Sequence, residues 1–87
     1  MEEISEVMEV GTQDQLNLFG QFDSHIKKLE RQLGVLVTDR NGQIRISGNA
    51  RNVKRARAVI LELTELSRRG NIIQEQNVDY AIAMTME

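Results

Sequence analysis

The residues of this chain that are best suited to chemistry lie within one short stretch, FGQFDSHIKKLERQLG, which runs from position 19 to position 34. Gly20 opens a turn, Phe22 offers an aromatic ring, and Lys27 and Lys28 follow on the next predicted helix. A glycine lets a nucleic-acid backbone approach closely, while lysines and the first amides of a helix attract phosphate. An exposed ring can stack on a base. The stretch therefore predicts a contact with single-stranded nucleic acid.

Asp23 lies in the same turn and changes this chemistry. Aspartate is a preferred N-cap residue, so its carboxylate is expected to accept hydrogen bonds from the first amides of the following helix. That carboxylate would fill the anion site from within the protein and would repel an incoming phosphate. Phe22 has a second interpretation as well, either as a core residue or as an anchor for a protein contact.

Other kinds of site find little support in the sequence. The absence of cysteine excludes disulfides and thiolate ligands, and a single histidine, His25, argues against a histidine-rich metal site. His25 lies beside Asp23 and Ser24, but neighbours on one helical turn point in different directions, so we interpret it as a partly exposed first-turn residue. The segment from Gly20 to Lys27 lacks the second glycine and the final Ser or Thr of a Walker A loop. We expect no catalysis and no bound cofactor or metal in these 87 residues.

The net charge of −2 hides an uneven distribution. Residues 1–24 carry six acidic and no basic residues, whereas residues 25–69 hold all eleven Lys and Arg against four acids, a local charge of +7. Only this basic middle would attract phosphates, although basic residues on helices often simply solvate an exposed face. The acidic start is unlike a signal peptide, and no apolar run approaches the roughly 20 residues of a membrane span. A cytoplasmic protein is therefore expected.

Periodicity predicts the elements that position these residues. Residues 4–10 read as a strand, and a short helix begins at residue 12 or 13 and ends at Gly20. A second helix, with Asp23 as its N-cap, continues to residue 33. Its apolar residues fall three and four apart, on one stripe that faces the core: Ile26, Leu29 and Leu33.

After Gly34 the pattern changes to strands. Asn41-Gly42 is the strongest short hairpin signal available, and the strand that follows it alternates apolar Ile44 and Ile46 with polar residues. Asn49 then begins a long helix that ends at residue 70, with apolar residues at helical spacing: Val53, Ala56, Val59, Ile60, Leu63 and Leu66. A last short helix begins near residue 76 or 77, with Met84 as a further candidate for its apolar face. Its apolar residues Val78, Ala81 and Ile82 favour packing on the rest of the domain.

The central stretch resembles the I-G-x-x-G-x-x-I-K-x-I-x-x-x-x-G signature of KH domains, except that Asp23 replaces the second glycine. This resemblance implies an α+β, KH-like fold of type I order, β-α-α-β-β-α. Its three-stranded antiparallel sheet would carry helices on one face, with one added C-terminal helix. We therefore expect residues 1–87 to form a single KH-like domain.

Longer runs narrow the resemblance further. QLNLFGQFDSHIKKLERQLGV, a hairpin ending IRISG, a helix ending ELSRRG and the trailing NVDYAI look like the N-terminal domain of PhoH-like proteins, over residues 7–84. That family implies a bacterial cytoplasmic protein associated with phosphate starvation and RNA metabolism, whose next domain is a P-loop ATPase. ATP and magnesium would then belong to that absent domain. The implied partners are the ATPase domain, single-stranded RNA and a protein such as a ribonuclease, with no membrane.

Two functions remain open for the domain itself. In the first, a degenerate GxxG turn gives weak, salt-dependent binding of single-stranded RNA, through Gly20, Gln21, Phe22, Asp23, Lys27, Lys28 and Arg45. Arg45, on the adjoining strand, would extend the track of cations. In the second, the domain is a docking or assembly module for the ATPase with no RNA affinity, which uses Asp23, the acidic first strand and apolar Leu18, Phe19 and Phe22. The basic face of the long helix would then meet an acidic partner or only solvent: Arg51, Lys54, Arg55 and Arg57.

Overall fold

The computed structural model describes residues 2–86 and places strands and helices in the predicted order. The strands are β1 (Glu3–Glu9), β2 (Leu36–Arg40) and β3 (Gln43–Asn49). The helices are α1 (Thr12–Phe19), α2 (Ser24–Leu33), α3 (Ala50–Arg68) and α4 (Glu75–Met84), and a short 3₁₀ turn, Gln21–Asp23, joins α1 to α2. The α+β class and the KH-like order with one added helix are therefore confirmed.

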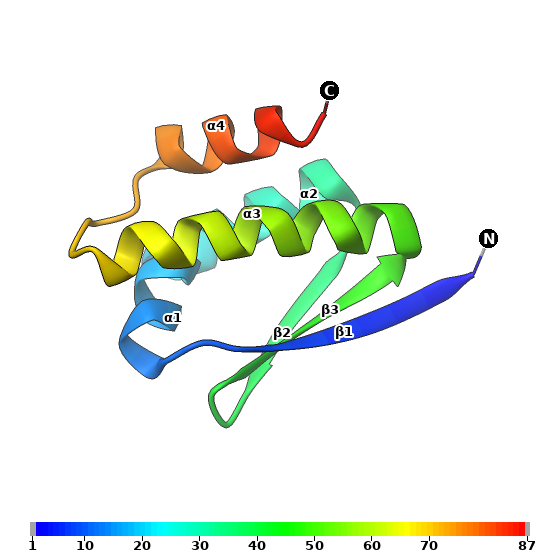
Figure 1. The fold of residues 1–87 in the computed structure, drawn as a ribbon, viewed down its shortest axis with the longest axis horizontal. Coiled ribbons are helices and arrows are strands. Elements are labelled where there is room, and N and C mark those ends of the chain that lie inside the picture. The colour runs from blue at the N-terminus through cyan, green and yellow to red at the C-terminus, as the bar shows by residue number, and fades with distance from the viewer. Residues whose placement is uncertain (1, 87) are drawn as a thin grey trace.

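The three strands form one antiparallel sheet in the order β1-β3-β2. Successive side chains of a strand point to opposite faces. Ile44 and Ile46 on β3 are fully buried, whereas Arg45 between them is exposed. Helices α1, α2 and α3 cover the face of Ile44 and Ile46, and no helix of residues 2–86 lies on the opposite face of the sheet (Figure 1).

The hairpin between β2 and β3 turns at Asn41 and Gly42, as its sequence predicts. Both residues have positive φ, 52° and 82° respectively, which is the conformation of a type I′ turn. This turn matches the right-handed twist of the two strands, and asparagine and glycine tolerate it best. The turn therefore sets the register in which Asp39 lies opposite Ile44.

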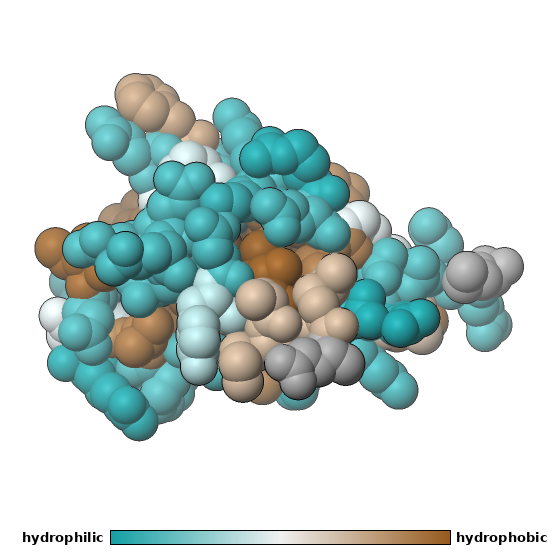
Figure 2. All heavy atoms as spheres, turned by 90° about the horizontal axis from the view of Figure 1, so that it is seen from above, coloured by the Kyte–Doolittle hydropathy of each residue, from teal (hydrophilic) through white to brown (hydrophobic). Residues whose placement is uncertain are grey.

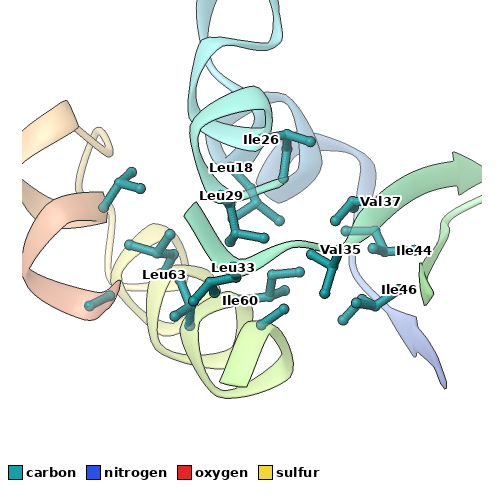
Figure 3. Close-up of a cluster of buried hydrophobic side chains, with 14 of the residues drawn as sticks. Leu18, Ile26, Leu29, Leu33, Val35, Val37, Ile44, Ile46, Ile60 and Leu63 are labelled. Atoms are coloured by element: carbon teal, nitrogen blue, oxygen red, sulfur yellow. The ribbon is translucent and has the colours of Figure 1, made fainter. Parts of the chain in front are cut away.

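The hydrophobic core lies between the sheet and the helices. Figure 3 shows side chains from α1, α2 and α3 converging on the inner face of the strands. The largest of those that are almost completely buried are Leu18, Leu29, Ile44, Ile46, Ile60 and Leu63. Burying an aliphatic side chain of this size contributes roughly 1.5–3 kcal/mol, so this shared cluster holds the layers together.

The fourth helix packs on α2 and α3, on the side away from the sheet (Figure 1). Val78, Ala81 and Ile82 are buried, as predicted, whereas Met84 is 55% exposed and lies outside the buried stripe. In Figure 2, which looks down on the α4 side, hydrophilic residues cover most of the surface around a smaller hydrophobic group near its middle. α4 is therefore part of the domain and not a free extension of it.

One asparagine ties the segment before α4 to the rest of the molecule. Asn17 Nδ2 donates to Ser67 Oγ at 2.9 Å and to the Asn71 carbonyl at 2.7 Å. Its Oδ1 accepts a hydrogen bond from the Ile73 amide at 2.9 Å. Because α1, the end of α3 and the segment before α4 all meet at this side chain, it fixes the path by which the chain returns over α2.

Thr64 on α3 is a polar residue buried in the hydrophobic core. Its Oγ1 has no hydrogen-bond partner among the described residues. Thr64→Val replaces the hydroxyl with a methyl group of similar shape, so we expect the free energy of unfolding in urea to rise by about 1 kcal/mol. Thr64→Ser keeps the hydroxyl but loses the methyl and should lower it. A valine variant no more stable than the parent would show that Oγ1 is already satisfied.

Candidate functional site

The turn between α1 and α2 has an unusual backbone. Gly20 has φ 77° and ψ 176°, and its amide closes α1 by donating to the Leu16 carbonyl at 3.1 Å. Phe22 (φ 56°, ψ 31°) and Asp23 (φ 59°, ψ 25°) both adopt the left-handed conformation. That conformation costs an L-residue roughly 1–2 kcal/mol, less for aspartate than for phenylalanine. The turn therefore has a strained backbone at Asp23, where a glycine would adopt the same conformation without strain.

Gly20 is also required by its closest neighbour. A Cβ atom at this position would lie 2.5 Å from Cδ2 of His25, well inside normal contact. The imidazole cannot simply move away, because its Nε2 lies 3.0 Å from the Ile73 carbonyl and forms a hydrogen bond with it. His25 is half-buried, as the sequence predicts for a first-turn residue, and it connects the turn to the segment before α4.

Asp23 occupies the N-cap position of α2 but does not cap it. Its carboxylate accepts no hydrogen bond from the first amides of the helix, so the prediction that it would fill this anion site is wrong. A capping side chain needs an extended N-cap backbone in order to fold back over the first turn. The left-handed backbone of Asp23 directs the carboxylate elsewhere.

That carboxylate instead lines a groove between α1 and the end of β2. The groove is bounded by Thr12, Gln15, Leu16, Phe19, Asp23 and Asp39, and is called here the Leu16 groove. Leu16 is 71% exposed, and Phe19 packs partly against the core. Leu16 and Phe19 are the apolar residues of its lining, and because two carboxylates and no basic side chain line the groove, its charge is negative.

The apolar residues of the turn are distributed differently from the prediction. Phe22 is 84% exposed, so its interpretation as a core residue is wrong, and its ring is accessible to a base or to a protein partner. Leu18, expected on a docking surface, is completely buried, and Leu16 is exposed in its place. The sequence contained the information needed to predict this difference, because residues two apart on a helix lie on nearly opposite faces.

The predicted cations do not converge on the turn. Lys28 forms ion pairs with Glu75 at 2.8 Å and with Asp79, both on α4, and its side chain is only 15% exposed. Lys27 is exposed and lines a hollow between α2 and the start of α4, together with Glu75 and with Arg31, which the prediction did not include among the site residues. Lys27 is thus the predicted lysine that remains open to solvent.

Arg45 lies on the far side of the sheet from the helices. It alternates with buried Ile44 and Ile46, and it donates to Ser5 Oγ at 3.2 Å on the open face. The expectation that Arg45 extends a track of cations from the turn is therefore wrong. The basic face of α3 is reduced as well, because Arg57 pairs with Glu6 at 3.1 Å.

The turn between α1 and α2 does not have the arrangement of a nucleotide-binding loop. A Walker A loop joins a strand to a helix, whereas the segment from Gly20 to Lys27 leads from the end of α1 into α2, so its residues do not fit a phosphate loop. Among residues 2–86, no group of three or more acidic or histidine side chains is arranged to hold a metal ion. Within the same range, no helix has both the length and the apolar character that a bilayer crossing requires.

Replacement of Gly20 tests how strictly the turn is constrained. We expect Gly20→Ala to lower the free energy of unfolding by about 2–4 kcal/mol, because alanine adds backbone strain and a clash with His25. Gly70→Ala is the matched control, since Gly70 also has positive φ but a Cβ added there would meet no atom within 4 Å. If both variants lose equal stability in urea denaturation, the contact with His25 is not a constraint.

The pairing of Lys28 predicts a dependence of stability on pH. Hydrogen bonds to Asp79 and then to Glu75 raise the pKa of Lys28 above its usual value of 10.5. A raised pKa in the folded state adds stability that is fully present below 10.5 and is lost as the pH rises through the raised value. We expect Lys28→Met to be less stable than the parent at about pH 8 and the difference to shrink toward about pH 12. A constant difference would mean that the ion pairs contribute nothing.

Comparison with known proteins identifies a relative of this chain. No family model matches the chain, and no solved structure matches it. The chain is 36% identical over 69 residues to the PhoH-like protein of Bacillus subtilis (strain 168), a match that covers 79% of this chain and 22% of that protein. The chain thus spans about a fifth of the length of this relative. It is homologous to part of a PhoH-like protein, which confirms the resemblance found in the sequence.

Proposed function

We propose that this chain is a KH-like accessory domain of a cytoplasmic PhoH-like, ATP-binding protein of RNA metabolism, and that its own role is to dock a protein partner. The homology to part of a PhoH-like protein supports the first half of this proposal. The rest of such a protein, or a separate protein such as a ribonuclease, would be the partner. Nucleotide chemistry would take place outside this domain, because its turn does not fit a phosphate loop.

The charge of the Leu16 groove carries the docking proposal. In a KH domain the nucleic acid lies against the turn between the first two helices, where phosphates need positive or neutral surroundings. Asp23 and Asp39 both line the groove at this turn. Two unit charges about 4 Å apart in water repel by roughly 1 kcal/mol, so each carboxylate disfavours a phosphate beside it. A protein surface with exposed apolar and basic side chains suits the groove better.

Weak binding of single-stranded RNA is the second candidate, and one observation favours it. Phe22 is 84% exposed next to α2, whose first amides are not capped by Asp23. A strand that stacks one base on Phe22 would carry its phosphates outside the groove, past Lys27 and Arg31. Lys28 and Arg45 would take no part, since the first is paired with α4 and the second faces away.

An NMR titration of the labelled chain with short single-stranded RNA of mixed sequence, at low and at physiological salt, separates the two candidates. Under the docking proposal we expect no saturable shifts in residues 20–31 at physiological salt. Asp23→Asn removes a charge without changing the tolerance for a left-handed backbone, and it should create binding only if the groove is a weakened RNA site. Glu62→Gln, an equal charge change on α3, is the control. Saturable, salt-sensitive shifts in the parent chain would favour RNA binding over docking.

A second measurement addresses the partner directly. Leu16 is 71% exposed, so Leu16→Glu should leave the free energy of unfolding within about 0.5 kcal/mol of the parent. We expect this variant of the full protein, purified from its native cells, to lose a protein that accompanies the parent form. Leu61→Glu, at an exposed apolar residue of α3, is the matched control and should retain it. An unchanged set of bound proteins would contradict docking to a separate protein.

A further inference from the structure

The Leu16 groove is shaped to take individual side chains and not a larger ligand. Its volume is about 230 Å³, below the roughly 300–1,000 Å³ of typical small-molecule pockets. Leu16, which is largely exposed, and Phe19, which is partly buried, are the apolar residues that line it. A hollow of this size accommodates one or two aliphatic side chains, as in the anchoring contacts at the centre of a protein interface.

The two aspartates that line the groove favour a positively charged ligand. Asp23 reaches the groove from the turn before α2, and Asp39 reaches it from the last part of β2. Asp39 lies opposite Ile44 in the sheet register, so its side chain is on the helix side, toward α1. Carboxylates on two different elements can receive a guanidinium or ammonium group between them, and Arg suits such pairing especially well.

The turn that carries Asp23 is held in place before any partner binds. Packing of Gly20 against His25 and the hydrogen bond from His25 to the Ile73 carbonyl limit its movement. The left-handed backbone at Phe22 keeps that ring exposed, directly before Asp23 in the chain. A preorganised site loses less conformational entropy on binding, and the ring offers additional apolar contact beside the groove.

Together these features identify the class of partner. Resting on the docking function proposed above, we propose that the Leu16 groove binds a short polypeptide segment of another protein that presents an aliphatic side chain close to an Arg or Lys. The aliphatic side chain lies on Leu16 and Phe19, and the cation lies between Asp23 and Asp39. An acidic segment is excluded by repulsion from both carboxylates, so the groove discriminates by charge as well as by shape.

Defined peptides provide the test, because the natural partner is not needed. We would use an array of dodecapeptides that contain one Leu and one Arg at spacings from adjacent to four apart. Matched arrays replace Arg with Glu or Leu with Ser. Peptides with both Leu and Arg should bind the 87-residue chain and shift NMR signals of residues 12–23 and 39. Either single replacement in the peptide should weaken binding by about tenfold.

Variants of the chain assign the two halves of the groove. Asp39→Lys should weaken the binding of Leu/Arg peptides by about tenfold and should strengthen the binding of Leu/Glu peptides. Leu16→Ser should weaken both peptide sets, whereas Glu62→Lys, an equal charge reversal outside the groove, should change neither. Asp39 and Leu16 are both exposed, and native NMR spectra of the variants would confirm that folding is intact.

The results separate failure of this inference from failure of the docking function. Equal binding of Leu/Arg and Leu/Glu peptides, shifts away from the groove, or no binding up to about 1 mM peptide would overturn the inference. If Leu16→Glu still abolishes a protein contact in cells, docking stands although the partner class is wrong. Groove shifts that grow with concentration of the chain alone, without peptide, would assign the groove to a second copy and would also overturn it.

Discussion

The close approach of Gly20 to His25 is the constraint on which the rest of this site depends. No side chain fits at position 20, because its Cβ would lie 2.5 Å from the imidazole. α1 must therefore end at Gly20, and the next three residues must complete a tight turn before α2 begins. The same imidazole bonds to the Ile73 carbonyl and so holds the segment that leads into α4. One contact thus relates the turn, the start of α2 and the position of the last helix.

The turn between α1 and α2 combines a left-handed backbone with a negatively charged groove. Asp23 adopts the left-handed conformation that the second glycine of the GxxG pattern would adopt easily, and its carboxylate lines the Leu16 groove together with Asp39. α4 also neutralises one cation of α2, because Glu75 and Asp79 pair with Lys28 on that helix. Lys27 and Arg31 on α2 remain exposed and can still attract phosphate near the turn.

Most of the fold could be predicted from local patterns in the sequence. The helical spacing of Ile26, Leu29 and Leu33, the Asn41-Gly42 turn and the N-cap at Asn49 each act over a few residues, and each appears in the structure as predicted. The composition of the site was also partly predictable, since Gly20, Phe22 and Asp23 do form one exposed turn. The exposure of Leu16 in place of Leu18 could have been predicted from helix periodicity, because residues two apart lie on nearly opposite faces of a helix.

By itself, the sequence determined the identity and order of the elements, the hairpin turn and the glycine-bearing turn, because each depends on short-range backbone preferences and hydrophobic spacing. Only the tertiary structure decided which charges serve the site. Asp39 lines the groove because it pairs with Ile44, whose side chain faces the helices. Arg45, the next residue along β3, faces the opposite side of the sheet and lies outside the groove. Lys28 is neutralised by residues 47 and 51 positions later in the chain. These outcomes depend on contacts between distant segments, which no local pattern contains.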